Sequence, residues 1–339
     1  MAHKMKLSNA LFSQEKIDWL QTILFERFGV FFAISECRES ENSVLCLALD
    51  QAEEYIVFDR LQHVFNESRS DFPCALWNAE REGFSSVLLS DLPAPGILVS
   101  PSPLVEKTNH EYRVHYDILG LTCWMLSRRE EIGRNDLDEH NRFPAKYSHA
   151  FLHHYLERPI VDEWLDILRQ LIQRVWPQLK LKRHQFEIKV SHDVDAPARY
   201  AFQNLKGILR TMAGDVIVRK DLRPAIVGPW IWLNSRHTIH PRDPVNTFDW
   251  LMDQSEHYGL TSAFYFICGR TDRSKDALYD PEMPQVRALM RKVHERGHEI
   301  GLHPSYNTFN NPDEIRREAD RLKKICCEEG IVQKSWGGR

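Results

Sequence analysis

Apolar residues recur at helical spacing in three stretches of the first half of the chain, which predicts amphipathic helices. The predicted helices cover residues 11–29, 117–131 and 160–175. Short apolar runs bounded by acidic residues, Pro and Gly predict strands over residues 44–49, 55–58, 86–89 and 97–100. The polar residues 132–157 are expected to form a long surface loop. Together these elements predict an α+β accessory domain over residues 1–182.

In the second half, predicted strands and helices alternate, and several helices end in Gly. Strands are expected over residues 186–195, 261–268 and 298–303, and helices over residues 203–213, 245–258, 283–296 and 311–329. Such alternation favours right-handed βαβ units, and therefore a parallel sheet or (β/α) barrel, over residues 183–339. Residues 215–242 contain three Pro, so we expect a long ordered loop there.

Side chains that can bind a metal lie where two of these predicted strands end. Asp193 and Asp195 are separated by one residue, so a strand places both carboxylates on the same face. His303 is the last residue of a later strand. Because the carboxyl ends of parallel strands meet at one rim, we expect these three side chains to lie within a few ångströms of one another.

The alternation that sets the direction of the two aspartates also sets that of Lys189. On this register the Lys189 side chain points into the barrel. An unpaired buried ammonium costs several kcal/mol. We therefore expect Lys189 to be paired with Glu187 or Glu299.

Carboxylate oxygens and imidazole nitrogens suit a borderline divalent cation such as Zn²⁺. Asn307, four residues after His303, could add a weaker oxygen ligand or only a hydrogen bond. The alternative is that the aspartates merely cap the following turn. Trp230 and Trp232 in the predicted loop could stack on a sugar ring or form a hydrophobic plug that packs the loop down.

Composition and the remaining motifs exclude several classes of function. The formal net charge is −4, from 44 Lys and Arg against 48 Asp and Glu, which gives no reason to expect nucleic acid as a partner. No apolar segment is long enough for a membrane span, and the start of the chain lacks the apolar core of a signal peptide. Seven Cys without a C-x-x-C pair favour a reducing compartment, and we expect a cytoplasmic location. No Gly-x-Ser-x-Gly elbow, P-loop or Gly-x-Gly-x-x-Gly turn is present.

Two motifs resemble those of a known family. Residues 191–195, Ser-His-Asp-Val-Asp, and residues 297–303, Gly-His-Glu-Ile-Gly-Leu-His, are similar to the first two motifs of the polysaccharide deacetylases, the NodB-homology or carbohydrate esterase 4 group. The resemblance covers roughly residues 185–339 and implies a distorted (β/α) barrel that uses a divalent metal, Zn²⁺ in our expectation. It also implies hydrolysis of N-acetyl or O-acetyl groups on a carbohydrate, in the metabolism of a surface polysaccharide.

Carried over residue by residue, the resemblance makes Asp193 the general base and Asp195 and His303 metal ligands. In such a reaction a backbone amide near Tyr306 could help the metal to stabilise the oxyanion, and the Tyr306 ring could bind the glycan. The preceding 180 residues resemble the uncharacterised N-terminal region that is found before a bacterial subset of such domains.

The sequence departs from the family pattern in two respects. Asn307 stands where the family has a second His, so the third metal ligand is an amide or is missing. The sequence stops after the third or fourth predicted barrel strand, and the later Arg and general-acid His have no counterpart. We therefore expect a barrel that is incomplete at its C-terminus, either part of a longer protein or completed by another chain, for example in a homo-oligomer. The alternative function is a degenerate glycan-binding module or an inactive fragment.

Overall fold

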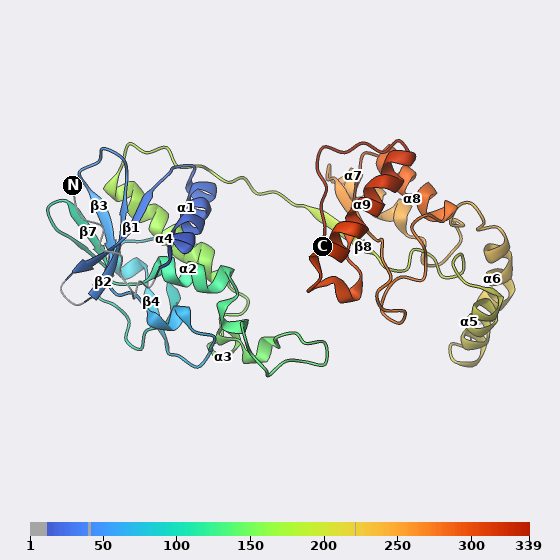
Figure 1. The fold of residues 1–339 in the computed structure, drawn as a ribbon, viewed down its shortest axis with the longest axis horizontal. Coiled ribbons are helices and arrows are strands. Elements are labelled where there is room, and N and C mark those ends of the chain that lie inside the picture. Colours follow the sequence, from blue (N-terminus) through green and yellow to red (C-terminus); the bar gives the residue numbers. More distant parts are fainter. Residues whose placement is uncertain (1–11, 40–41, 221) are drawn as a thin grey trace. The chain divides into compact units, whose positions relative to one another are not determined.

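The computed structural model of this chain describes residues 12–39, 42–220 and 222–339. It consists of two compact units, Met1–His184 and Gln185–Arg339 (Figure 1). The boundary lies two residues beyond the predicted one at 182/183. Each unit has its own set of buried apolar side chains.

The N-terminal unit contains a five-stranded sheet in the order β1-β2-β3-β7-β6 and a separate two-stranded sheet, β4-β5. β3 and β7 run parallel, and the other neighbours run antiparallel. The strands are β1 (Ala33–Glu39), β2 (Asn42–Ala48), β3 (Tyr55–Phe58), β4 (Cys74–Asn78), β5 (Asp91–Pro95), β6 (Val105–Lys107) and β7 (Glu111–Val114).

The predicted strands over residues 86–89 and 97–100 are wrong. Val87, Leu88, Leu98 and Val99 are exposed and lie outside the strands. In the second run the Ile97 carbonyl accepts from the Ala75 N–H of β4, but residues 98 and 99 form a bend. A short apolar run alone does not make a strand.

The helices of this unit are α1 (Gln14–Phe28), α2 (Ile118–Leu126), the short α3 (His149–Leu152) and α4 (Ile160–Val175). The Ser13 hydroxyl accepts from the Lys16 amide at the start of α1, and Gly29 ends the helix at φ +71°. The three predicted helices are confirmed, although α2 is shorter than expected. Single-turn 3₁₀ helices occupy His63–Asn66, Glu80–Glu82, Arg129–Glu131, Ala145–Tyr147 and, in the other unit, Tyr306–Thr308.

In the C-terminal unit, three parallel strands form a sheet in the order β10-β9-β8. The strands are β8 (Val190–Val194), β9 (Ser262–Ile267) and β10 (Glu299–His303), and the helices that alternate with them are α7 (Phe248–His257), α8 (Pro284–Glu295) and α9 (Pro312–Glu328). One face of the sheet is apolar and buried in the same core as the helices (Figure 1). The predicted βαβ alternation is therefore present. The described strands form an open sheet, which a single bridge between Leu302 and Gly338 extends, and a closed barrel stays a prediction.

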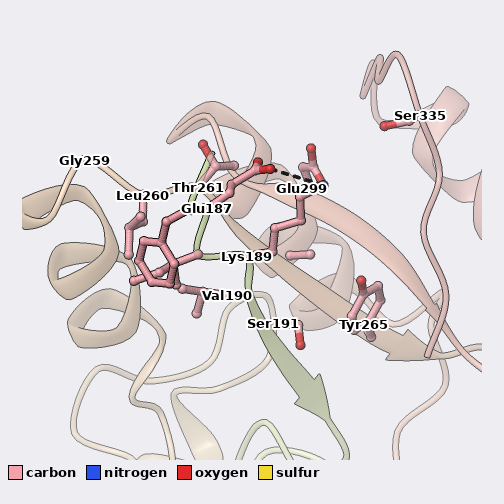
Figure 2. Close-up of a pocket in the computed structure, with 13 residues that line it drawn as sticks. Glu187, Lys189, Val190, Ser191, Gly259, Leu260, Thr261, Tyr265, Glu299 and Ser335 are labelled. Carbon is pink, nitrogen blue, oxygen red and sulfur yellow. Dashed lines mark ion pairs between the residues drawn. The ribbon is translucent and has the colours of Figure 1, made fainter. Parts of the chain in front are cut away.

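The opposite face of this sheet lines a hollow of about 720 Å³ (Figure 2). Lys189 lies at its edge with a side chain that is 82% exposed, and its ammonium nitrogen is 3.9 Å from a Glu187 carboxylate oxygen. The expected partner is thus Glu187, but the expected burial of Lys189 is wrong. The register is not shifted, because Lys189 simply precedes β8, which begins at Val190, on a face that remains open to solvent.

The predicted loop over residues 215–242 is also largely wrong, because it contains a second helix. α5 (Leu205–Ile217) and α6 (Arg223–Leu233) form a helical hairpin in the connection between β8 and α7 (Figure 1). One proline lies in the first turn of α6, where a missing backbone donor costs nothing, and Pro229 lies inside the helix. Three prolines therefore misled the prediction.

None of the helices in the described ranges has both the length and the apolar character needed to cross a lipid bilayer.

A buried histidine fixes the polar stretch that precedes α4. The His149 side chain is fully buried, stacks on Phe72 and lies 3.1 Å, through Nε2, from the Phe72 carbonyl oxygen. Since a carbonyl only accepts, Nε2 carries the proton and Nδ1 accepts from the Tyr155 hydroxyl at 2.5 Å. Burial, with a smaller contribution from the neighbouring His153, lowers the pKa of His149 to about 4.

We predict that His149 makes the N-terminal unit sensitive to acid. Between the unfolded pKa of 6.5 and the folded pKa of about 4, only the unfolded state takes up this proton, so stability falls as pH falls through that window. The full contribution is about 3 kcal/mol at ~1.4 kcal/mol per pKa unit. Denaturant unfolding of the full chain as a function of pH measures it. His149→Asn should be less stable than wild type at neutral pH, and its free energy of unfolding should change less as the pH falls. His110→Asn, which changes an exposed side chain, is the control and should follow wild type. A variant curve parallel to wild type would contradict the assignment.

Candidate metal centre at the strand ends

The three predicted site residues lie together at the carboxyl ends of β8 and β10. Nε2 of His303 is 3.7 Å from Oδ1 of Asp195 and 4.0 Å from Oδ2 of Asp193. The expected convergence of these side chains is therefore present. It follows from the register, in which Asp193 pairs with Tyr265 of the central strand and Tyr265 pairs with Gly301.

The hydrogen bond of His303 determines which nitrogen faces the carboxylates. Nδ1 lies 3.0 Å from the Pro304 carbonyl oxygen, which can only accept, so Nδ1 carries the proton. In the neutral ring Nε2 then has a lone pair, and this lone pair faces Asp193 and Asp195. Two carboxylates that face an imidazole nitrogen are stabilised either by a proton on that nitrogen, which makes the contacts ion pairs, or by a metal cation between them. Metal-binding histidines have the same arrangement, with the second ring nitrogen donating to a carbonyl or carboxylate.

The donor set fits a divalent cation in chemistry and nearly fits it in distance. Ligand atoms at 2.0–2.2 Å from one tetrahedral Zn²⁺ lie roughly 3.3 Å apart, only slightly closer than His303 and Asp195 are here. Within the described residues, no group of three or more His, Cys, Asp and Glu side chains already has the geometry of a metal site. A contraction of a few tenths of an ångström at His303 and Asp195 would bring this pair to ligand spacing.

Asn307 and Tyr306 are turned to other partners. The Asn307 side-chain amide donates to the Thr271 carbonyl at 3.2 Å, and among the described contacts none joins Asn307 to the three central residues. The Tyr306 backbone N–H donates to Asp276 at 2.7 Å, so it is already used within the protein. The Tyr306 ring lies under the Lys275 ammonium, 3.7 Å from its centroid. In this conformation neither residue supplies the ligand or the backbone donor that the resemblance suggested.

Trp230 and Trp232 both belong to α6 but have different surroundings. The Trp232 indole N–H donates to the Gln203 carbonyl at 2.8 Å, and its ring packs against the small core of the hairpin, as the hydrophobic-plug interpretation expects. Trp230 is half exposed and meets His240 edge to face at 4.6 Å. Among the described contacts, neither tryptophan touches the Asp–His group.

An arginine reaches the site, contrary to the expectation from the sequence. Nε of Arg339 is 3.7 Å from Oδ2 of Asp193, and its guanidinium donates to the Ser191 hydroxyl at 3.1 Å. The Arg339 backbone N–H donates to the Leu302 carbonyl at 3.1 Å, which aligns this segment with β10. The signal in the sequence was the apolar start at Ile331 after the Gly330 helix stop, which indicates a further short extended segment.

Buried acidic residues fix the turn that follows His303. Glu318 of α9 is 2% exposed and accepts hydrogen bonds from both the backbone N–H and the hydroxyl of Ser305. Asp276 accepts from the Tyr306 N–H and, through its other oxygen, from the Asp272 N–H at 2.7 Å. These bonds hold in place the turn that follows His303. No local sequence pattern identified Glu318 or Asp276.

A buried tyrosine ties the ends of β8 and β9 together. The Tyr279 hydroxyl donates to the Val194 carbonyl at 2.7 Å and accepts from the Ile267 N–H at 2.8 Å. Val194 lies between the two site aspartates. Burial raises the pKa of Tyr279 well above its usual value, so the hydroxyl keeps its proton and both bonds persist at neutral pH.

We predict that Tyr279→Phe lowers the free energy of unfolding by about 1–3 kcal/mol, because it leaves one buried N–H and one buried carbonyl without a partner. Denaturant unfolding measures the loss. Tyr258→Phe, which changes an exposed hydroxyl, is the matched control and should stay within about 0.5 kcal/mol of wild type. Equal stability of wild type and Tyr279→Phe would show that the hydroxyl does not hold the strand ends.

Comparison with known proteins assigns the N-terminal part of the chain. No curated protein and no solved structure matches the sequence. The model of one family, described as a family of unknown function and designated DUF7033, matches residues 8–177. The matched residues fall within the N-terminal unit, so the match does not extend to Asp193, Asp195 or His303. Because it spans half of the sequence, the chain belongs to the DUF7033 family.

Proposed function

We propose that the C-terminal unit is a metal-dependent hydrolase that removes acetyl groups from a carbohydrate. One observation carries the proposal: Nε2 of His303 faces both Asp193 and Asp195, while its Nδ1 is held by the Pro304 carbonyl. An arrangement with so much negative charge and one lone pair is stabilised by a cation at its centre. The two motifs at residues 191–195 and 297–303 supply the choice of reaction by resemblance.

Asp195 and His303 would hold the divalent ion, for which Zn²⁺ suits a mixed carboxylate and imidazole set. When bound, such an ion polarises the acetyl carbonyl and lowers the pKa of water. Asp193, 4.0 Å from the imidazole, is the group that accepts the proton of the attacking water. The bond from water oxygen to the acetyl carbon forms, the carbon–nitrogen bond breaks, and the proton on Asp193 can pass to the departing amine.

Arg339 acts on Asp193 as a positioning residue in this proposal. Its guanidinium contacts the Asp193 carboxylate and also bonds Ser191, two residues earlier on the same face of the strand. The guanidinium and the imidazole approach the same oxygen, Oδ2 of Asp193, so Arg339 fixes the position of that oxygen. The proposed setting is the metabolism of a surface polysaccharide in the cytoplasm.

The test compares metal content with acetate release. Asp193→Asn should retain Zn²⁺, measured by mass spectrometry of the purified full chain, and lose acetate release from N-acetylated oligosaccharides by about 10²–10⁴-fold. Asp195→Asn and His303→Gln should lose both metal and activity. Asp313→Asn, which changes an exposed carboxylate on α9, is the control and should change neither.

The outcomes separate the proposal from its alternatives. Wild type that binds Zn²⁺ and glycan without releasing acetate would replace the enzyme with a glycan-binding module. Wild type that binds no divalent ion would remove the proposed site altogether. Equal loss of metal in Asp193→Asn and Asp195→Asn would reassign Asp193 as a ligand.

A further inference from the structure

The α5–α6 hairpin exposes an unusual amount of apolar side chain. On α5, Leu205, Leu209 and Val216 share one face at helical spacing and are exposed. On α6, Ile226, Trp230 and Leu233 form a second exposed stripe with the same spacing. An amphipathic helix in a folded protein normally turns such a stripe towards a core.

The hairpin already has a core, and these stripes are not part of it. Tyr200, Ile208 and Ile231 are buried with Met212 and Trp232 packed against them. Gly228 lies so close to the Tyr200 ring that an added Cβ would come within 3.1 Å of it. The two helices are therefore held together by other residues, and the exposed stripes do not take part in the core of the hairpin.

Exposed apolar side chains also lie at the junction between the two helices. Ile217 and Val218 are 75% and 79% exposed, and Leu222, just before α6, is 64% exposed. The backbone around them is well bonded, because the N–H groups of Val218 and Arg219 both donate to the Gly214 carbonyl. We call Ile217, Val218 and Leu222 the hairpin tip.

Basic residues are frequent in the hairpin, and Arg219, Lys220 and Arg223 adjoin the tip. Residues 203–242 contain seven Lys and Arg against two Asp, in a chain whose net charge is −4. The basic residues are Lys206, Arg210, Arg219, Lys220, Arg223, Arg236 and Arg242. Asp215, the described acidic residue, is buried and already paired with Arg199 and Arg219. With seven basic and two acidic residues, the hairpin segment is therefore net positive in sequence.

We propose that the hairpin docks on the surface of an anionic phospholipid bilayer, with the tip inserted among the lipid headgroups. Aliphatic side chains enter the boundary between headgroups and acyl chains, and Lys and Arg around them bind lipid phosphates. The exposed apolar residues belong to both helices and to the tip that joins them. A fluid lipid surface can surround such a tip, whereas a folded protein partner covers one side. This docking is peripheral and independent of the proposed hydrolase function.

The test is sedimentation of the full chain with vesicles of phosphatidylcholine alone or mixed with phosphatidylglycerol. Wild type should bind the mixed vesicles, bind neutral vesicles weakly, and lose binding as salt is raised. Ile217→Ser, Val218→Ser and Leu222→Ser combined should lower the partition coefficient at least about tenfold. Leu98→Ser with Val99→Ser, an equally exposed apolar pair in the N-terminal unit, is the control and should bind as wild type does.

Two further measurements keep the result decisive. Lys206→Glu with Lys220→Glu changes only exposed side chains and should weaken binding to the anionic vesicles, even if the serine variant folds poorly. Brominated lipids should quench wild-type tryptophan fluorescence more than that of Trp230→Phe. Equal binding of the tip variant and wild type, or no binding to anionic vesicles, would overturn the proposal. A dimer that the tip variant loses, without vesicle binding, would assign the hairpin to contact between copies of this chain.

Discussion

The parallel register of β8, β9 and β10 is the constraint on which the candidate centre depends. Asp193, Tyr265 and Gly301 lie side by side across the sheet, so the residues just beyond them, Asp195 and His303, leave the strands at the same level. Gly301 is required here, because a Cβ at this position would come within 2.4 Å of the Tyr265 ring. A shift of one residue in either outer strand would turn its site residue to the helix-covered face.

This register is held by bonds that cross the strand ends as well as by the ladders. The Tyr279 hydroxyl joins β8 to β9, and Gln333 exchanges hydrogen bonds with both backbone groups of Ile300 in β10. Glu318 then fixes the turn after His303. Each of these groups bonds backbone, so each acts on the position of a site residue without touching that residue's side chain. Precise placement of reactive groups depends on such supporting contacts.

The sequence predicted the parts of this fold that depend on local pattern. Helices α1, α4, α8 and α9 and strands β8, β9 and β10 follow from apolar periodicity and from helix stops such as Gly29 and Gly297. The meeting of Asp193, Asp195 and His303 followed from one rule, that parallel strands end at one rim.

What the sequence could not supply is set by contacts between distant residues. The sequence of strand β1 is Ala-Ile-Ser-Glu-Cys-Arg-Glu, which is too polar to predict a strand. The strand forms because it pairs with β2. Tyr279 is 85 residues from its acceptor Val194. Arg339 reaches Asp193 only because its segment pairs with Leu302. For α6 the local sequence predicted a loop, because its prolines are typical of loops. The apolar residues at helical spacing in the same segment were not taken as evidence of a helix.

The connection that begins at Asp195 links the two proposals through topology. In a βα unit this connection leaves from the carboxyl end of its strand, the rim on which catalytic groups gather. Here it is extended by α5 and α6 before α7 begins at Phe248, far beyond the two to six residues of ordinary βα loops. An insertion at this point adds a surface to the rim while leaving the packing of the sheet on α7, α8 and α9 unchanged. The hairpin has its own small core, so it can bind a surface without disturbing the sheet that carries Asp193, Asp195 and His303.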